Sequence, residues 1–260
     1  MNLIIGHTSQ LSYYFPLDYV RMSSRNIDFE FLKENTWESV YICFAEQNMI
    51  DQNIDFMTPN FLKTKQIIEA LENSAKKVVV YTTCELWNQL KESIDINTPF
   101  NYVFNNNYCY SKDLLCKWIK DERTKNRMKN VIIIHPFSFN SIHRTQNYLF
   151  GKIFHSIINK EKINIGYTYY LRDIVHTKYM VEKSIKATKD EVIGSGQLTH
   201  INGFIRDLYA SYQMDYKDWV IENLEQKSPD RFYHSNQKKI YSYKMLMHDT
   251  IEDIQKELNK

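Results

Sequence analysis

The stretch VVVYTTCE, residues 78–85, decides the fold predicted for this chain. Three valines and a tyrosine run without polar alternation, and polar residues follow directly; such a short β-branched run is typical of a parallel strand buried on both faces. Similar apolar runs occur at 3–5, 40–44 and 131–134. The segments 60–74 and 107–120, which lie between these runs, have helical periodicity. The alternation of strand and helix predicts an α/β fold with a doubly wound parallel sheet, whose ligand crevice lies at the carboxyl ends of the strands.

Composition and charge exclude several classes of protein. Hydrophobic residues make up 43% of the 260 residues and charged residues 25%, which excludes a fibre or a disordered chain. Lys and Arg number 33 against 31 Asp and Glu, a balance that indicates no nucleic-acid partner. No stretch approaches the roughly 18 apolar residues of a membrane span, and the N-terminus has no basic leader. Because the four cysteines include no CxxC pair, we expect a protein of the reducing cytoplasm, with no membrane partner.

Residue counts disfavour two kinds of ligand site. The chain has only 6 glycines, where an average usage of ~7% would give roughly 18, and this shortage argues against a glycine-rich phosphate cradle. The 8 histidines show no HxxxH or comparable spacing with acids, so we expect no metal site.

One constellation indicates proton-transfer chemistry. Tyr108 and Lys112 lie four residues apart at the start of a predicted helix, which places the phenol and the ammonium on one face, one turn apart. A neighbouring cation favours tyrosinate and lowers the phenol pKa from ~10 towards the range of a general acid or base. Thr83 follows the strand at 78–81 and is placed to orient the oxygen that the tyrosine protonates. In isolation the same residues are equally those of a solvated Tyr/Lys pair and a strand end.

Four blocks, taken in order, resemble motifs of the extended short-chain dehydrogenase/reductase family, the nucleotide-sugar epimerases, dehydratases and ketoreductases. They are Tyr81–Asn88, His135–Ser138, Leu171–His176 and Gly194–Thr199. The first is similar to the family's strand-end (Ser/Thr)-x-Glu-Val-Tyr-Gly motif, and Tyr108 follows Thr83 at a familial spacing of 25 residues. The third closely resembles the family's Arg-Asp-Phe-Ile-His motif. The resemblance covers roughly residues 1–210.

The resemblance implies a domain plan. Residues 1–137 would form a dinucleotide-binding Rossmann-type domain, to which segments near 171–196 return. Residues 138–170 and 197–260 would form a small, mainly helical substrate-binding cap at the C-terminal side. Within it, Thr250 is expected to cap a last helix.

The resemblance also implies roles for individual residues. Tyr108 would be the acid/base, Lys112 its partner and a ribose ligand, and Thr83 the hydroxyl on the substrate oxygen. Arg172 would grip the diphosphate of a nucleotide sugar with its planar fork. Further positions are expected to contact substrate (Thr83, Glu85, Ser138, Asn147) or cofactor (Pro136).

The expected cofactor loop departs from the family's Gly-x-x-Gly-x-x-Gly. After the strand at 3–5 the sequence reads Gly6-His7-Thr8-Ser9-Gln10-Leu11-Ser12, with serines where two glycines are usual. We expect Gly6, Thr8, Ser9, Gln10 and Leu11 to contact the cofactor. The serines can donate hydroxyls to a phosphate, and a following helix would offer its N-terminal N–H groups to an anion.

The second strand, residues 19–22, indicates the type of cofactor. Ser24 and Arg25 follow it, where an enzyme that uses NAD usually has an acid for the ribose 2′-hydroxyl. An arginine beside a hydroxyl suits a 2′-phosphate, so NADP is expected over NAD. Phe44 and Ala45, after the next strand, are expected against the cofactor.

These expectations lead to an NADP-dependent oxidoreductase that acts on a nucleotide sugar by keto reduction or epimerisation. Glu85 leaves a second reaction open, because 4,6-dehydratases of the family use an acid at this place, although epimerases and reductases often have a glutamate there too. A catalytically silent dinucleotide-binding or regulatory protein is the third alternative. The resemblance implies a homodimer through the helices at 61–73 and 108–120, and products used in polysaccharide biosynthesis.

Overall fold

The structure is a computed structural model of the 260-residue chain, and it describes residues 1–48, 53–103, 106–225, 233–237 and 240–260. Two compact units divide the chain. The first contains residues 1–89, 96–136 and 181–192, and the second contains residues 90–95, 137–180 and 193–260.

A six-stranded sheet, in the order β11-β6-β4-β3-β1-β2, is the centre of the first unit. Its strands are β1 (Asn2–Ile5), β2 (Val20–Met22), β3 (Ser39–Ile42), β4 (Val78–Tyr81), β6 (Val131–Pro136) and β11 (Glu191–Ile193). The pairs β1/β2, β1/β3, β3/β4 and β4/β6 are parallel. Residues 78–81 are buried throughout, as their continuous apolar run predicts. The predicted α/β fold with a parallel sheet is confirmed.

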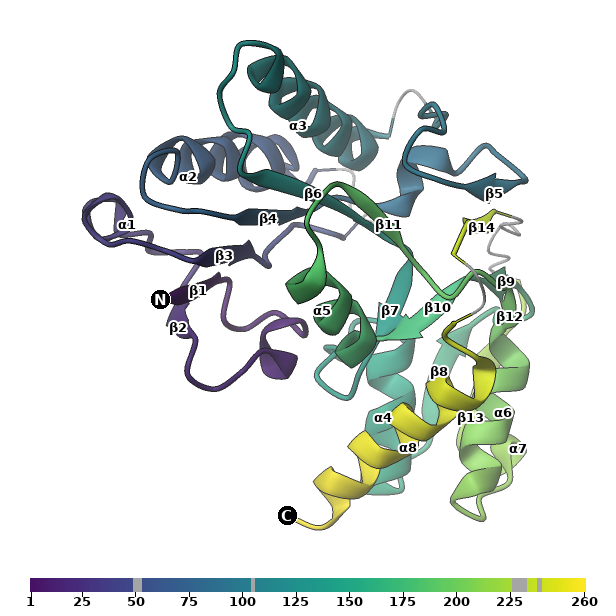
Figure 1. Ribbon diagram of the computed structural model, residues 1–260. Coiled ribbons are helices and arrows are strands. Elements are labelled where there is room, and N and C mark those ends of the chain that lie inside the picture. Colours follow the sequence, from purple (N-terminus) through teal and green to yellow (C-terminus); the bar gives the residue numbers. More distant parts are fainter. Residues whose placement is uncertain (49–52, 104–105, 226–232, 238–239) are drawn as a thin grey trace. The chain divides into compact units, whose positions relative to one another are not determined.

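Helices cover the sheet of the first unit. Those described are α1 (Phe29–Glu34), the π-helical turn η2 (Thr58–Lys63), α2 (Thr64–Ala70), the 3₁₀ turn η3 (Cys84–Trp87), α3 (Asn107–Thr124) and α5 (Thr177–Lys186), whose later part belongs to this unit. In Figure 1, α2 and α3 lie together on one face of the sheet. Asn106 caps α3, since its Oδ1 accepts a hydrogen bond from the N–H of Cys109 at 3.0 Å.

The helix expected after β1 is absent, which corrects the sequence expectation. Only a three-residue 3₁₀ turn, η1 (Ser12–Tyr14), follows the loop. A continuing helix would need the N–H of residue 16 for the carbonyl of Ser12, but Pro16 has none. Arg21 on β2 replaces that donor, with one guanidinium nitrogen 2.7 Å from the Ser12 carbonyl and the other 3.4 Å from that of Phe15.

The second unit combines helices with short two-stranded sheets. Its strand pairs are β7 (Ser138–Asn140) with β10 (Ile174–His176), β9 (Leu171–Arg172) with β12 (Thr199–His200), β8 (Ile163–Gly166) with β13 (Val220–Asn223), and β5 (Ser93–Ile94) with β14 (His234–Ser235). Its helices are α4 (Leu149–Asn159), α6 (Ile201–Ser211), α7 (Tyr216–Trp219) and α8 (Tyr243–Leu258). Among the described residues, no helix has the length and apolar character needed to cross a membrane.

The predicted start of the last helix is wrong. α8 begins at Tyr243, where the Ser242 hydroxyl accepts a hydrogen bond from the N–H of Met245 at 3.3 Å. Thr250 lies inside this helix, and its hydroxyl donates to the Leu246 carbonyl four residues earlier at 2.7 Å. The side chain therefore bonds back to the preceding turn of the helix, a use of threonine that competes with capping.

Candidate functional site

The carboxyl ends of β1 and β3 meet at the point where the sheet order reverses. The chain leaves β1 towards β2 on one side and later returns to β3 on the other side of β1. In doubly wound sheets, ligands bind at such a switch point, because the loops diverge there and open a crevice.

Gly6 has a conformation and surroundings that only glycine fits. Its φ is +98°, and an added Cβ would lie 3.0 Å from both the backbone N and the Cβ of Phe44. The loops after β1 and β3 therefore approach each other closely at this point. The first glycine of the expected cofactor loop thus has a physical reason to be there.

Ser12 turns inward, which corrects the expectation that both serines offer hydroxyls to a phosphate. It is fully buried, and its hydroxyl lies 2.6 Å from the carbonyl of His7 and 2.7 Å from that of Ser9. Ser9 remains partly exposed, and its hydroxyl accepts a long bond from the N–H of Leu11 at 3.4 Å. Ser12 thus joins two parts of its own loop by hydrogen bonds.

Replacing Ser12 with alanine should lower the free energy of unfolding by about 1–2 kcal/mol, because the hydroxyl bonds that close the loop are lost. Chemical denaturation measures this change. Ser9→Ala is the matched control and should have a smaller effect, since the bond that its hydroxyl accepts from the Leu11 N–H is long, at 3.4 Å. Equal stability of the Ser12 variant and the wild-type protein would contradict a loop held by this hydroxyl.

The loop after β2 presents Ser24 and Arg25, as the sequence predicts. Arg25 is exposed, and its backbone N–H donates to the Ser23 hydroxyl at 3.2 Å. Lys63, the last residue of η2, donates to the Ser24 carbonyl at 2.9 Å.

Asn60 connects the loop after β3 with α3, and sequence reasoning missed it. Its amide nitrogen donates to the Glu46 carbonyl at 3.0 Å and to the Ser111 hydroxyl at 3.3 Å, and its oxygen accepts from the Glu46 N–H at 2.9 Å. The side chain is fully buried. The sequence did contain a signal for Asn60, because it is a polar residue in the segment 60–74, a helix predicted to pack on the core. Asn60 holds the segment after Phe44 and Ala45 against the helix that carries Tyr108.

Thr83 and Glu85 lie in the turn that follows β4. The Thr83 hydroxyl accepts a hydrogen bond from the N–H of Glu85 at 3.1 Å and caps η3. Both side chains are buried, at 6% and 8% exposure. The thiol of Cys109 on α3 donates to the Glu85 carbonyl at 3.5 Å, so this turn and the start of α3 are in contact.

His135, which begins one of the four motif blocks, supports the same strand end, a role that the sequence did not indicate. Its Nδ1 lies 2.6 Å from the Thr82 hydroxyl, and its ring packs against Trp87 with centroids 5.1 Å apart. Burial lowers the pKa of His135 to about 3, so the ring is neutral at physiological pH. A neutral, buried imidazole here positions Thr82, the neighbour of Thr83.

Tyr108 and Lys112 occupy the first turns of α3. Tyr108 is 6% exposed and packs edge-on against Phe56, with ring centroids 5.8 Å apart. Lys112 is 2% exposed, and its Nζ donates to the Tyr81 carbonyl at 3.1 Å. Desolvation lowers the pKa of Lys112 to about 8. No carboxylate in the described part of the chain forms an ion pair with it.

Arg172 and its neighbours belong to the second unit. The Arg172 guanidinium lies over the Tyr170 ring at 4.2 Å and donates to the Leu171 carbonyl at 2.7 Å. Ser138 begins β7 and donates its N–H to the Asp173 carbonyl at 3.1 Å. Asn147 is exposed in the loop before α4.

Asp173 explains why glycine and serine follow β11. Its carboxylate accepts bonds from the N–H and hydroxyl of Ser195 at 2.6 and 2.7 Å, and from those of Ser235 at 2.8 Å each. A Cβ on Gly194 would lie 2.5 Å from the Ser235 hydroxyl and 2.6 Å from Asp173 Oδ2. One buried network of hydrogen bonds within the second unit therefore joins the Arg-Asp and Gly-Ser-Gly motifs.

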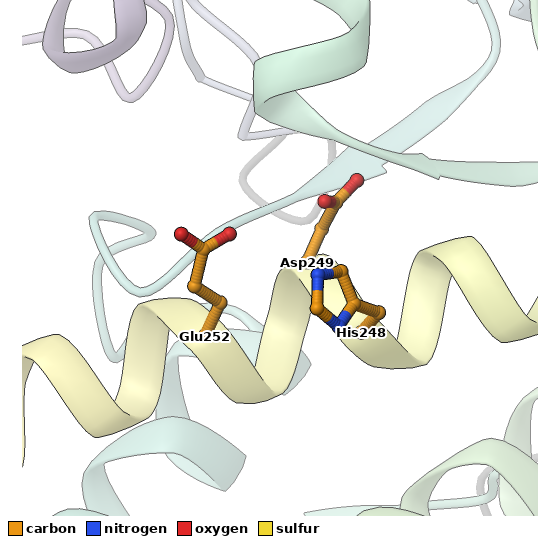
Figure 2. A group of neighbouring side chains, drawn as sticks. All are labelled: His248, Asp249 and Glu252. Carbon is orange, nitrogen blue, oxygen red and sulfur yellow. The ribbon is translucent and has the colours of Figure 1, made fainter.

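Three side chains of α8 resemble a metal-ligand set. His248, Asp249 and Glu252 place one ligand atom each within 4.8 Å of the others, on adjacent turns of the helix, as Figure 2 shows. Both carboxylates already have protein partners: Glu252 lies 2.7 Å from Lys256 Nζ, and Asp249 accepts from the Tyr241 hydroxyl at 2.6 Å. The bond to Lys256 and the charge of Lys178 lower the pKa of Glu252. These contacts account for the cluster, and we assign no metal to it.

A cavity of about 500 Å³ in the first unit is lined by other residues than those predicted for the site. They are Phe100, Asn101, Tyr102, Asp113 and Lys117. The Tyr102 hydroxyl and Lys117 Nζ both lie 2.8 Å from Asp113 Oδ2. The polar groups of this lining thus bond to one another.

Comparisons with known proteins give matches at the level of structure. No family model and no curated protein matches the chain. RMD from Pseudomonas aeruginosa complexed with NADPH has 12% identity and a TM-score of 0.77, over 98% of this chain and 99% of that chain. TunA, an NAD-dependent NDP-hexosamine 5,6-dehydratase of tunicamycin biosynthesis, has 14% identity and a TM-score of 0.78, over 100% and 99%. The dTDP-glucose 4,6-dehydratase of Bacillus anthracis in complex with NAD has 15% identity and a TM-score of 0.76, over 98% of this chain and 97% of that chain.

The chain has the extended short-chain dehydrogenase/reductase fold. This confirms the fold that the four sequence motifs imply. Because the sequence identities are only 12 to 15%, the similarity concerns the fold alone.

Within the extended short-chain dehydrogenase/reductase fold, the first unit carries most of the predicted site. Its residues follow the carboxyl ends of β1, β2, β3, β4 and β6 or begin α3: Gly6, Thr8, Ser9, Gln10, Leu11, Ser24, Arg25, Phe44, Ala45, Thr83, Glu85, Tyr108, Lys112 and Pro136. Ser138, Asn147 and Arg172 lie in the second unit. The roles of all these residues stay predictions.

Proposed function

We propose that the protein is an NADP-dependent oxidoreductase that acts on a nucleotide-activated sugar, by keto-sugar reduction or epimerisation. The buried ammonium of Lys112, one helical turn after Tyr108, carries this proposal. A lysine that is 2% exposed and bonded to a backbone carbonyl destabilises the fold, and strongly perturbed groups of this kind cluster at functional sites. A solvated Tyr/Lys pair, the bland alternative, does not account for this burial.

The three side chains divide the proton chemistry between them. Tyr108 donates its hydroxyl proton to the sugar oxygen that becomes an alcohol, and takes it back in the oxidative direction. The Lys112 ammonium stabilises the tyrosinate that remains, and its spare N–H donors suit a ribose hydroxyl. Thr83, on the turn in contact with α3, would orient the sugar oxygen by a hydrogen bond from its hydroxyl. The nicotinamide cofactor supplies the hydride when it is bound.

The loop after β1 fits a dinucleotide. The close approach at Gly6, which a Cβ would fill, leaves backbone rather than side chain at the switch point. Gln10 and Leu11 would contact the diphosphate, beside Thr8 and Ser9. Phe44, Ala45 and Pro136 would line the cofactor, and Ser24 and Arg25 would favour NADP over NAD.

Substrate contacts are proposed for five residues. Thr83 and Glu85 would face the sugar, and Ser138, Asn147 and Arg172 would bind the nucleotide part, with Arg172 on the diphosphate. The protein would work in the cytoplasm as a homodimer through α2 and α3, in polysaccharide biosynthesis.

Glu85 favours a second candidate, a nucleotide-sugar 4,6-dehydratase. Glu85 is buried, at 8% exposure, in the turn that contacts α3. A buried carboxylate at this place suits the removal of a proton beside the sugar carbonyl.

Purified protein, NADPH and a panel of 4-keto nucleotide sugars test the proposal. Consumption of NADPH with at least one sugar, followed by absorbance, is the expected result. A 4-keto-6-deoxy product formed without added NADPH would indicate the dehydratase. Cofactor binding without turnover of any sugar would indicate a silent binding protein.

A further inference from the structure

Two cations beside the loop after β2 have no acidic partner among the described residues. Some other lysines of the first unit do have one: Lys33 pairs with Glu30, Lys65 with Glu69, and Lys76 with Glu38. Arg25 and Lys63 form no ion pair in the part of the chain that the structure describes. Positive charge is therefore left uncompensated at this loop, which favours an anion.

Lys63 reaches this loop from a distant part of the sequence. It is the last residue of the π-helical turn η2, and its Nζ lies 2.9 Å from the carbonyl of Ser24, 39 positions away. One of its three ammonium protons is used there, so further donors remain for a ligand. π-helical turns are frequent at functional sites, and this one also carries Asn60.

The acidic residue that follows β2 most closely, which could favour NAD, has another structural role. No acidic residue lies between Val20 and Ile27, and the next one, Asp28, caps α1. Its Oδ1 accepts a hydrogen bond from the N–H of Phe31 at 2.9 Å. A carboxylate used as a helix cap is held by that role and is not offered to a ribose diol.

We propose that Lys63 is a specificity-determining residue that binds the ribose 2′-phosphate of NADP, together with Arg25 and the hydroxyl of Ser24. A phosphate monoester carries close to two negative charges at neutral pH, which matches two unpaired cations and a hydroxyl donor. The inference rests on the proposed function only in its choice of cofactor. Lys63 is separate from Tyr108 and Lys112 and takes no part in proton transfer.

Equilibrium binding to the full chain tests the proposal without any sugar substrate. Dissociation constants for NADPH, NADH and adenosine 2′,5′-bisphosphate are measured by titration calorimetry on wild type, Lys63→Gln, Lys63→Arg and Lys65→Gln. We expect Lys63→Gln to weaken NADPH and the bisphosphate by roughly tenfold to a hundredfold, the range for loss of one hydrogen bond to a charged group, and NADH by less than about threefold. Lys63→Arg should retain most of the affinity, and Lys65→Gln should bind as wild type does.

The remaining outcomes overturn the proposal and separate its failure from that of the proposed function. An equal loss of NADPH and NADH affinity would show that Lys63 only holds the 23–25 loop. Wild-type protein that binds NADH as tightly as NADPH would remove the 2′-phosphate site but leave hydride transfer intact. Wild-type protein that binds neither cofactor would refute this inference and the proposed function together.

Discussion

Tyr108→Phe should lower kcat for keto-sugar reduction by about a hundred- to ten-thousandfold, while the Kd for NADPH changes little. The phenyl ring keeps its packing against Phe56, so the start of α3 is preserved and only the proton donor is lost. Single-turnover kinetics with saturating NADPH measure the chemical step directly. The loss should appear in kcat and kcat/KM alike, because the hydroxyl acts in the transition state.

Tyr110→Phe is the matched control for this experiment. Tyr110 lies two residues further along α3 and is 48% exposed, so its hydroxyl faces away from the buried side of the helix. We expect wild-type kinetics from it. Full activity in Tyr108→Phe would refute the assignment of Tyr108 as the acid/base.

The sheet was predictable because its strands are buried on both faces. Continuous apolar runs such as 78–81 and 131–134 need no alternation, and they appear in the structure as β4 and the first part of β6. The helix after β1 could not be rejected from the serine loop alone. Its absence depends on Pro16 together with Arg21, a side chain from the next strand that supplies the missing donor to the Ser12 carbonyl.

The candidate site, like the fold, was predictable from the sequence only in part. The spacing of Tyr108 and Lys112 identifies one helical face, but the nearly complete burial of Lys112 depends on the strand end above it, where Tyr81 offers its carbonyl. Asn60 and Lys63 act through partners from the loops after other strands, so no local pattern indicates them. The predicted helix cap at Thr250 is wrong for a local reason, because a threonine inside a helix and a threonine at its N-cap look alike in sequence.

Lys112→Met should lower kcat/KM by about a hundredfold or more and, at the same time, raise the free energy of unfolding at pH 7 by about 2 kcal/mol. Activity falls because the cation that stabilises the tyrosinate is lost. Stability rises because the folded protein no longer buries an ammonium. The fall in the pKa of Lys112 from 10.5 to about 8 corresponds to a destabilisation of the folded protein by about 3 kcal/mol. Removing the lysine relieves this, but it also removes the bond to the Tyr81 carbonyl, which costs about 1 kcal/mol of stability.

The pH dependence of that gain separates a buried charge from simple repacking. Below pH 8 the amine is protonated in both the folded and the unfolded chain, so the desolvation penalty is complete. Between pH 8 and 10.5 the folded state holds fewer protons, so the wild-type protein becomes relatively more stable as pH rises and the advantage of Lys112→Met disappears. Urea denaturation at pH 7 and pH 10 measures this, with the exposed Lys120→Met expected to change stability by under about 1 kcal/mol without a pH trend. A stability gain of the same size at both pH values would mean that packing, rather than the buried ammonium, sets the effect.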